Sequence, residues 1–241
     1  MSYTIIIPAR YQSTRLHAKP LQTVRGKPLI AYTYDNATKT QANRIIIATD
    51  HIAIKQVACS LGAEVVMTQE TCSTGTDRVA EAAKRADLDN QQVIVNLQSD
   101  EPLLAAHAID SLAKAHQQQG HFMSTLYYNN HDMTQFNDRD TVKVVVNKNH
   151  LALNFSRSPI PYGQYDHFKQ HLGIYAYKRC CLDEYVSLEQ PEWEKTESLE
   201  QLRALWHGKS VGVFQAELNH APIGVDTPDD LERFDKHLEL V

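Results

Sequence analysis

Residues 4–21 read TIIIPARYQSTRLHAKPL, and the rest of the chain is interpreted outward from this stretch. Residues 3–8 form a short, β-branched apolar run, which is typical of a strand buried on both faces of a parallel sheet. Arg10, Arg15 and Lys19 follow in a segment with neither helical nor strand periodicity. An open α/β sheet binds its ligand on loops that leave the carboxyl ends of its strands. Cations along such a loop can converge on a triphosphate, although a solvated basic loop explains the local pattern equally well.

Composition narrows the class of protein. A chain of 241 residues with 42% apolar residues can bury a sizeable core, and one α/β domain is the simplest expectation. The formal net charge of −5 makes nucleic acid an unlikely partner, whereas a basic loop in an acidic protein suits a small anionic ligand.

The sequence also indicates where the protein works. Met1 leads directly into the first predicted strand without the pattern of a signal peptide, and no apolar run is long enough to cross a bilayer. The four cysteines show no CxxC spacing, so we expect reduced thiols in a cytoplasmic protein rather than disulfides or a zinc site.

The first half of the chain alternates between predicted strands and helices. This alternation is typical of βαβ units and a parallel sheet. After the first strand we expect strands at residues 44–49, 64–67 and 93–97, and helices at about 28–41, 52–61, 77–86 and 106–118.

The second half has fewer helices between its strands, which favours a mixed or antiparallel extension of the sheet. The predicted strands are 122–128, 141–146, 152–155, 172–177 and 212–217, with helices at 179–188 and 194–206. A last helix should begin after Thr227, a good N-cap followed by Pro228. We see no repeat, linker or clear domain boundary.

Carboxylates follow two predicted strands. Asp100 and Glu101, in QSDEP, come directly after the strand at 93–97, and Asp226 precedes the last helix. Beside a loop of cations they suggest Mg²⁺ held jointly by protein and phosphate oxygens. Helix capping explains Asp100 and Glu101 more simply when the motif is taken alone. The cap at Thr227 is complete without Asp226, which slightly favours a functional role for that residue.

Other candidate residues are weaker when they are taken singly. Residues 73–78, STGTDR, form a small polar loop that opens a helix and either binds an anion or base or simply caps the helix. Arg157 is either a carboxylate clamp or a surface ion pair, and His171 is either a site residue or a structural histidine. No hydrolase triad, HExxH motif, P-loop or dinucleotide fingerprint is present.

Taken together and in this order, these segments resemble the CMP-Kdo synthetases, which are 3-deoxy-manno-octulosonate cytidylyltransferases. The matching segments run from residue 5 to about 234 and read IIPARYQSTRL, KPL, GKPLI, IIIATD, STGTDR, VIVNLQSDEP, VKVV, NFSRSPIP, HLGIYAY, LEQLRALWHG and GVDTPDDLERF.

The resemblance implies a three-layer, Rossmann-like α/β domain with a mixed, mostly parallel sheet and an antiparallel extension, around residues 155–177, used for dimerisation. It implies one nucleotidyltransferase domain over residues 1–241. Residues 1–118 would mainly bind CTP, 119–215 would form the sugar-acid pocket and dimer region, and 216–241 would carry the metal aspartate and a closing helix. The implied reaction is CTP + Kdo → CMP-Kdo + pyrophosphate, for lipopolysaccharide synthesis in the cytosol of a Gram-negative bacterium.

The resemblance also implies roles for individual residues. Arg10, Lys19 and Asp100 would be catalytic, and Asp100 and Asp226 would bind Mg²⁺. The nucleotide would be bound by Ala9, Arg10, Arg15, Lys19, Thr74, Gly75, Arg78, Gln98 and Ser99. The sugar acid would be bound by Arg157, His171, Tyr175, Glu197, Glu200 and Gln201.

Two departures from the family pattern fall near the nucleotide site. The family usually has Pro-Gly where His17-Ala18 stands, and Gly where Ser99 stands. If position 99 requires a positive φ, Ser99 would cost about 1 kcal/mol or crowd the base, so we expect an active enzyme with altered CTP affinity. The stretch between Tyr162 and His171 is also short, which affects the sugar pocket.

Three alternatives remain at this point. The substrate is another keto sugar acid, such as 8-amino-Kdo or a sialic acid; the chain is a catalytically weak sugar-nucleotide binder; or it acts on a sugar or alcohol phosphate. The combination of Lys19, Asp100 and Asp226 argues against a mere binder. Arg157 as the only evident cation of the sugar pocket argues against a second phosphate site.

Overall fold

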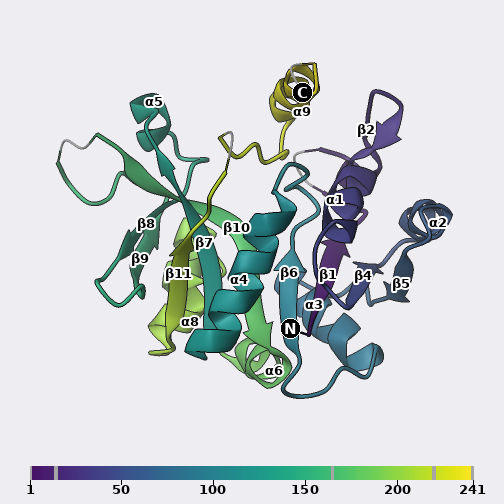
Figure 1. Ribbon diagram of the computed structural model, residues 1–241, viewed down its shortest axis with the longest axis horizontal. Helices are drawn as coiled ribbons and strands as arrows, with labels where there is room; N and C mark the ends of the chain where they lie inside the picture. Colours follow the sequence, from purple (N-terminus) through teal and green to yellow (C-terminus); the bar gives the residue numbers. More distant parts are fainter. Residues whose placement is uncertain (1, 14–15, 164–165, 219–220, 240–241) are drawn as a thin grey trace.

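A computed structural model describes residues 2–13, 16–163, 166–218 and 221–239. Within these ranges nine strands form one sheet, whose main path has the order β11-β7-β10-β6-β1-β4-β5 (Figure 1). The strands are β1 (Tyr3–Ala9), β4 (Arg44–Thr49), β5 (Glu64–Met67), β6 (Val93–Leu97), β7 (Met123–Asn130), β8 (Lys143–Val146), β9 (Ala152–Ser156), β10 (Phe168–Lys178) and β11 (Val211–Gln215). A separate two-stranded ribbon joins β2 (Thr23–Val24) to β3 (Lys27–Pro28).

β1 lies inside the sheet, between β6 and β4, and all seven of its residues are buried. It pairs in parallel with β4, with Ile5 opposite Ile45, and with β6, with Tyr3 opposite Val93. Its side chains alternate between two cores: Ile5 and Ile7 belong to one apolar cluster, and Ile6 belongs to the other.

Helices cover both faces of the sheet and so make three layers. The first cluster receives α1 (Leu29–Thr38), α2 (Ile52–Ser60) and α4 (Ala106–Gln119); α4 crosses the near face in Figure 1. The second receives α3 (Gly75–Arg85), α6 (Arg179–Ser187) and α8 (Leu202–Trp206). The predicted three-layer α/β fold with a mixed, mostly parallel sheet is confirmed.

The antiparallel part of the sheet is built on β10. This strand runs antiparallel to both β6 and β7, with an irregularity between Leu172 and Tyr175, and β11 is parallel to β7. At its beginning β10 also pairs with β8, where Gln170 lies opposite Lys143, and β8 and β9 form a hairpin. The extension therefore exists as predicted; its use for dimerisation stays a prediction.

The prediction of a single helix at 194–206 is wrong. The structure has two short helices, α7 (Glu192–Glu197) and α8, because Ser198 between them adopts a left-handed conformation with φ 53°. Leu202 is fully buried, whereas Trp206 is 62% exposed.

The last helix, α9 (Pro228–His237), begins as predicted. Thr227 accepts a hydrogen bond from the Asp230 backbone N–H, and the Asp230 carboxylate accepts one from the Thr227 N–H, so the two form a capping box. Phe234 packs with Leu29 and Val225, which fixes α9 at the edge where β1 and β6 end (top in Figure 1).

The remaining elements are the 3₁₀ turn η1 (Lys19–Leu21) and the one-turn helix α5 (Met133–Phe136). Within the described ranges, no helix has the length and apolar character that spanning a bilayer requires.

Candidate active site

Two cavities meet at the carboxyl edge of the parallel strands. The first has a volume of about 260 Å³ and lies between the loop after β1, the start of α3 and the end of β6. The second, of about 790 Å³, lies between β10, the 135–142 segment and the segment that leads into α9. The residues that line both cavities are Gln98, Asp100, Glu200 and Asp226. A group bound in one cavity can therefore meet a group bound in the other at these four side chains.

Lys19 lies at this junction and bridges two carboxylates. Its Nζ donates to Asp100 Oδ2 at 2.6 Å and to Asp226 Oδ1 at 2.9 Å. Burial acts to lower the pKa of Lys19, but the two carboxylates outweigh it and the pKa is raised. The backbone fixes the arrangement, because the Val225 N–H donates to the Asp100 carbonyl at 2.9 Å. The predicted convergence of the loop cation with both aspartates is present.

The two carboxylates also fit a hard divalent cation. Both aim an oxygen at one point, now held by the Lys19 ammonium, and carboxylate oxygens are the ligands that Mg²⁺ prefers. The described part of the chain contains no group of three or more acidic, histidine or cysteine side chains that could hold a metal. This donor set suits a metal that is completed by substrate phosphate oxygens. Asp100 and Glu101 do not cap α4, whose N-cap is Ala105.

Most of the predicted nucleotide residues line the first cavity. These are Arg10, Lys19, Thr74, Gly75, Arg78, Gln98 and Ser99. Two others are placed differently. Ala9 is fully buried in the core and lines neither cavity, and Arg15 lies outside the described residues.

The start of α3 forms one wall of this cavity. Thr74 caps the helix through a capping box with Asp77. Gly75, the first residue of the helix, lines the cavity together with Thr74. A Cβ on Gly75 would come within 3.0 Å of Gln98 Oε1, so glycine permits the close approach of this turn to Gln98. The loop therefore caps the helix and also lines the cavity; that it binds an anion or a base stays a prediction.

Arg78 has a structural role as well as lining the first cavity. Its guanidinium is 2% exposed, and Nη2 donates to Asp50 Oδ2 at 2.8 Å. Because Asp50 follows β4, this ion pair ties α3 to the edge of the sheet.

Five of the predicted sugar residues line the second cavity: Arg157, His171, Tyr175, Glu200 and Gln201. The Tyr175 hydroxyl donates to Gln201 Oε1 at 3.0 Å, and His171 Nε2 lies 3.0 Å from Thr125 Oγ1. Burial lowers the pKa of His171 to about 3, so its imidazole is neutral. His171 is thus a hydrogen-bonded buried histidine that also faces the cavity.

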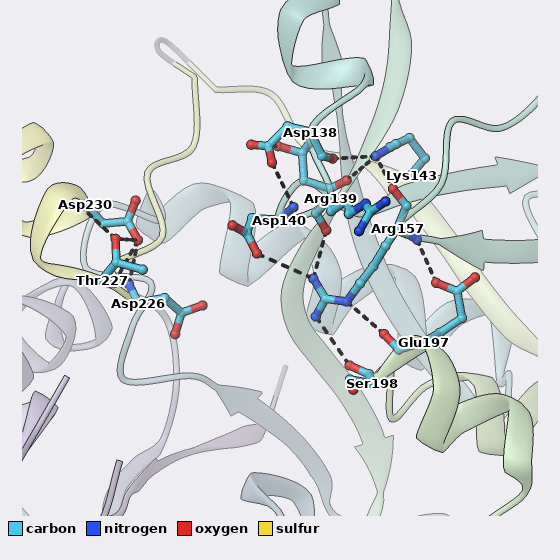
Figure 2. Close-up of polar contacts among 11 residues, drawn as sticks. Asp138, Arg139, Asp140, Lys143, Arg157, Glu197, Ser198, Asp226, Thr227 and Asp230 are labelled. Atoms are coloured by element: carbon cyan, nitrogen blue, oxygen red, sulfur yellow. Dashed lines mark hydrogen bonds and ion pairs between the residues drawn. The ribbon is translucent and has the colours of Figure 1, made fainter. Parts of the chain in front are cut away.

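Arg157 lines this cavity and is held mainly by backbone carbonyls, with a long ion pair to Asp140 beside them (Figure 2). Its Nε donates to the Glu197 carbonyl at 2.8 Å and its Nη1 to the Arg139 carbonyl at 2.9 Å, whereas the Asp140 carboxylate is 4.0 Å away. Nη2 also donates to the Ser198 carbonyl at 3.5 Å, so these hydrogen bonds use three of the five N–H groups of the guanidinium and leave one each on Nη1 and Nη2.

Glu197 is not among the described residues that line either cavity, which corrects its predicted place in the sugar pocket. Its carboxylate accepts hydrogen bonds from Ser156 Oγ at 2.7 Å and from the Arg157 backbone N–H at 2.9 Å. Glu197 therefore holds the chain that carries Arg157.

Comparison with known proteins identifies the family. The family described as Cytidylyltransferase matches residues 4–211. The 3-deoxy-manno-octulosonate cytidylyltransferase of Pseudomonas syringae pv. syringae is 41% identical, over 99% of this chain and 98% of its own length. That of Glaesserella parasuis is 39% identical, over 100% and 99%. The chain belongs to the 3-deoxy-manno-octulosonate cytidylyltransferase family.

Solved structures agree with this membership. A CMP:2-keto-3-deoxy-manno-octonic acid synthetase in complex with CTP superposes with a TM-score of 0.90 at 35% identity, covering 99% of this chain and 98% of the other. A cytidylyltransferase from Leptospira borgpetersenii, at 14% identity and a TM-score of 0.63, covers 100% of this chain and 87% of its own and shares the fold.

The backbone strain that was expected at one departure from the family pattern, Ser99, is found at the other, Ala18. Ser99 is not among the described residues with positive φ, and its carbonyl accepts a hydrogen bond from Thr33 Oγ1 at 3.1 Å. The backbone strain expected at Ser99 is therefore absent. Ala18, where the family usually has glycine, has φ 47° and ψ 41°, the left-handed region. The unfavourable departure is Ala18, directly before Lys19.

Two further cavity residues were missed by sequence reasoning. Glu101, weighed beside Asp100 as a metal ligand or a helix cap but not assigned to the sugar pocket, lines the second cavity; burial, then Asp100, raises its pKa to about 8. Arg233, on α9, also lines this cavity while it pairs with Asp230. The position of Glu101 beside Asp100 was an available signal. No local pattern distinguishes Arg233 from an ordinary exposed helix residue.

Proposed function

We propose that this chain transfers CMP from CTP to Kdo and releases pyrophosphate. One observation carries the proposal: Lys19, Asp100 and Asp226 converge where the two cavities meet. Family membership supports the same reaction, since the relatives are named for it. The smaller cavity would hold the nucleotide and the larger one the sugar acid.

The chemistry at the junction is an in-line displacement. The anomeric hydroxyl of Kdo attacks the α-phosphorus of CTP, and pyrophosphate leaves on the opposite side. The protein mainly has to orient the reactants and neutralise charge. Lys19 and Arg10 would stabilise the charge that develops on the leaving pyrophosphate, since both line the nucleotide cavity.

Asp100 and Asp226 would hold Mg²⁺ together with phosphate oxygens. The metal, when bound, would polarise the α-phosphate and lower the pKa of the attacking hydroxyl. Lys19 would then exchange its carboxylate partners for phosphate oxygens. No side chain at the junction is required as an obligatory base.

Arg157 would bind the carboxylate of the sugar acid, with the free N–H groups of its guanidinium. Tyr175 and Gln201 would contact hydroxyl groups of the sugar acid, because both residues line the same cavity. His171, being neutral, would donate or accept a hydrogen bond and would not add charge.

The decisive experiment is pyrophosphate release from CTP and Mg²⁺ with Kdo, 8-amino-Kdo and a sialic acid offered separately. We expect Kdo to give the highest kcat/KM. A clear preference for another of the three acids would change the substrate but keep the chemistry. Silence with all three, together with measurable CTP binding, would contradict the proposal and favour a sugar-nucleotide binder.

We also propose that the chain acts as a homodimer in the cytoplasm. The surface of the extension contains a cavity of about 480 Å³, beside the fully exposed Tyr162, whose lining combines the apolar residues Val144, Val145, Val146, Pro161 and Phe168 with Asp166, His167 and Lys169. Apolar surface of this kind favours a second copy as partner. The free cysteines among the described residues fit a reducing compartment. A monomeric mass in light scattering at micromolar concentration would contradict the dimer.

A further inference from the structure

Lys143, on β8, is a fully buried lysine whose ammonium is held by backbone alone (Figure 2). Its Nζ donates to the carbonyls of Asp138 at 2.7 Å, Thr141 at 2.6 Å and Arg157 at 2.6 Å. An ammonium has three N–H groups, so these contacts use its whole donor capacity.

The charge of Lys143 is expensive to bury. Burial lowers its pKa, the nearby Asp138 opposes that shift, and Arg157 adds to it. None of the three acceptors is a carboxylate, so the positive charge is solvated by carbonyl dipoles rather than cancelled by a hydrogen-bonded anion. A methionine would fill the same space without this desolvation cost. The position therefore calls for a role that depends on the charge or on the three hydrogen bonds.

These three carbonyls belong to Arg157 itself and to the 138–141 segment that contacts its side chain. Asp138 and Thr141 enclose the segment whose Arg139 carbonyl accepts from Arg157 Nη1 at 2.9 Å. The third carbonyl belongs to Arg157 itself. Lys143 thus ties the backbone of Arg157 to the loop against which its side chain rests.

The sugar-acid cavity needs positive charge at this end. Its described lining is rich in acidic side chains: it includes Asp100, Asp138, Asp140, Asp226, Asp229 and Asp230, beside Glu101 and Glu200, whose pKa values burial raises. The cations in that lining, again within the described residues, are Arg157 and Arg233, and Arg233 pairs with Asp230. An anionic sugar acid would be repelled by such a wall unless Arg157 is fixed and supported by a second positive charge.

We propose that Lys143 is a positioning residue for the carboxylate of the sugar acid, holding Arg157 in place and adding positive potential behind it. This inference rests on the proposed function, in which the larger cavity binds a sugar acid. Lys143 itself touches no substrate and acts through Arg157.

The first test compares Lys143→Met with Lys148→Met, a control on the exposed turn that joins β8 to β9. We expect Lys143→Met to raise the KM for the sugar acid by roughly tenfold or more, since loss of a positioning contact misplaces the clamp. The KM for CTP should stay within about twofold of wild type, because the nucleotide cavity does not include this region. The control should change neither value. An unchanged KM for the sugar acid in folded Lys143→Met would overturn the inference.

The second test asks whether the effect concerns the carboxylate. The kcat/KM for the sugar acid is divided by that for its carboxamide, in wild type, Lys143→Met, Arg157→Gln and the double variant. We expect the ratio to fall in Lys143→Met, and to be no lower in the double variant than in Arg157→Gln, because Lys143 acts through Arg157. Equal losses for acid and amide would indicate general damage to the fold and would overturn the inference.

Two further outcomes are distinguishable. If Lys143→Met gives no folded protein, as judged by CTP binding, the ratio is measured on Lys143→Gln, whose amide keeps donors but carries no charge. Loss of fold in both would make Lys143 a folding residue and refute the positioning role. If instead wild-type protein fails to discriminate between acid and amide, or Arg157→Gln changes nothing, the assignment of Arg157 under the proposed function fails.

Discussion

Ala18 shows how one residue sets the conformation of the catalytic loop. Its left-handed backbone, with φ 47°, turns the chain directly into η1, which presents Lys19 to Asp100 and Asp226. An L-residue with a side chain pays about 1–2 kcal/mol in this region, whereas glycine does not. Ser99 carries no such cost.

We therefore expect Ala18→Gly to raise the free energy of unfolding by about 1 kcal/mol, measured by urea denaturation. Ser99→Gly is the matched comparison and should leave stability unchanged or lower it by up to about 1 kcal/mol, since glycine there only adds backbone freedom. An equal or larger gain from Ser99→Gly would show that the strain has been placed at the wrong residue. The KM for CTP should be the same in Ser99→Gly as in wild type.

At the scale of elements, α7 and α8 are held together by a buried ion pair across the break at Ser198. Arg203 donates to both carboxylate oxygens of Glu194, at 2.8 and 2.7 Å, and the two side chains are 6% and 2% exposed. The pair matters for the site because the segment between these helices carries Glu200 and Gln201 into the sugar-acid cavity.

Removing one partner would leave the other charge buried and unpaired. Glu194→Ala should therefore lower the free energy of unfolding by about 3 kcal/mol or more. Glu184→Ala, which removes the half-exposed pair with Lys209, should cost less than about 1 kcal/mol. Similar losses in urea denaturation of the two variants would contradict a special role for the buried pair.

The same elements show how far sequence reasoning reaches. The strands at 44–49 and 93–97 have the predicted bounds, because buried β-branched runs identify strands without reference to the rest of the chain. The break at Ser198 was missed because serine, unlike glycine, gives no local signal for a left-handed residue. The carbonyl contacts of Arg157, and the role of Glu197, depend on tertiary structure and no spacing in the sequence reveals them.

At the scale of the whole molecule, stability should depend on two buried histidines. Burial lowers the pKa of His116 to about 4 and that of His171 to about 3, below their ordinary value of 6.5. The unfolded chain therefore binds more protons below about pH 6.5, and stability that is present above this pH falls as the pH decreases toward the folded values.

His116 isolates the effect, because it lies between α4 and β7, with Nδ1 2.8 Å from Ser124 Oγ, and outside both cavities. Between its unfolded and folded pKa values, each such histidine lowers the free energy of unfolding by about 1.4 kcal/mol for every pH unit of acidification. Between pH 7.5 and 5.0, wild type should lose about 2 kcal/mol more than His116→Gln in urea denaturation. The exposed control His131→Gln should follow wild type. Parallel curves for wild type and His116→Gln would contradict the assignment.

The account as a whole depends on the junction of the two cavities being the reaction centre. The most direct measurement is the kcat of Asp100→Asn with CTP and Kdo at saturating Mg²⁺, with CTP binding measured on the same protein. We expect kcat to fall by roughly a hundredfold or more while CTP still binds, because an uncharged amide would hold Mg²⁺ at the α-phosphate much more weakly than the carboxylate does. A kcat near that of wild type would contradict the account.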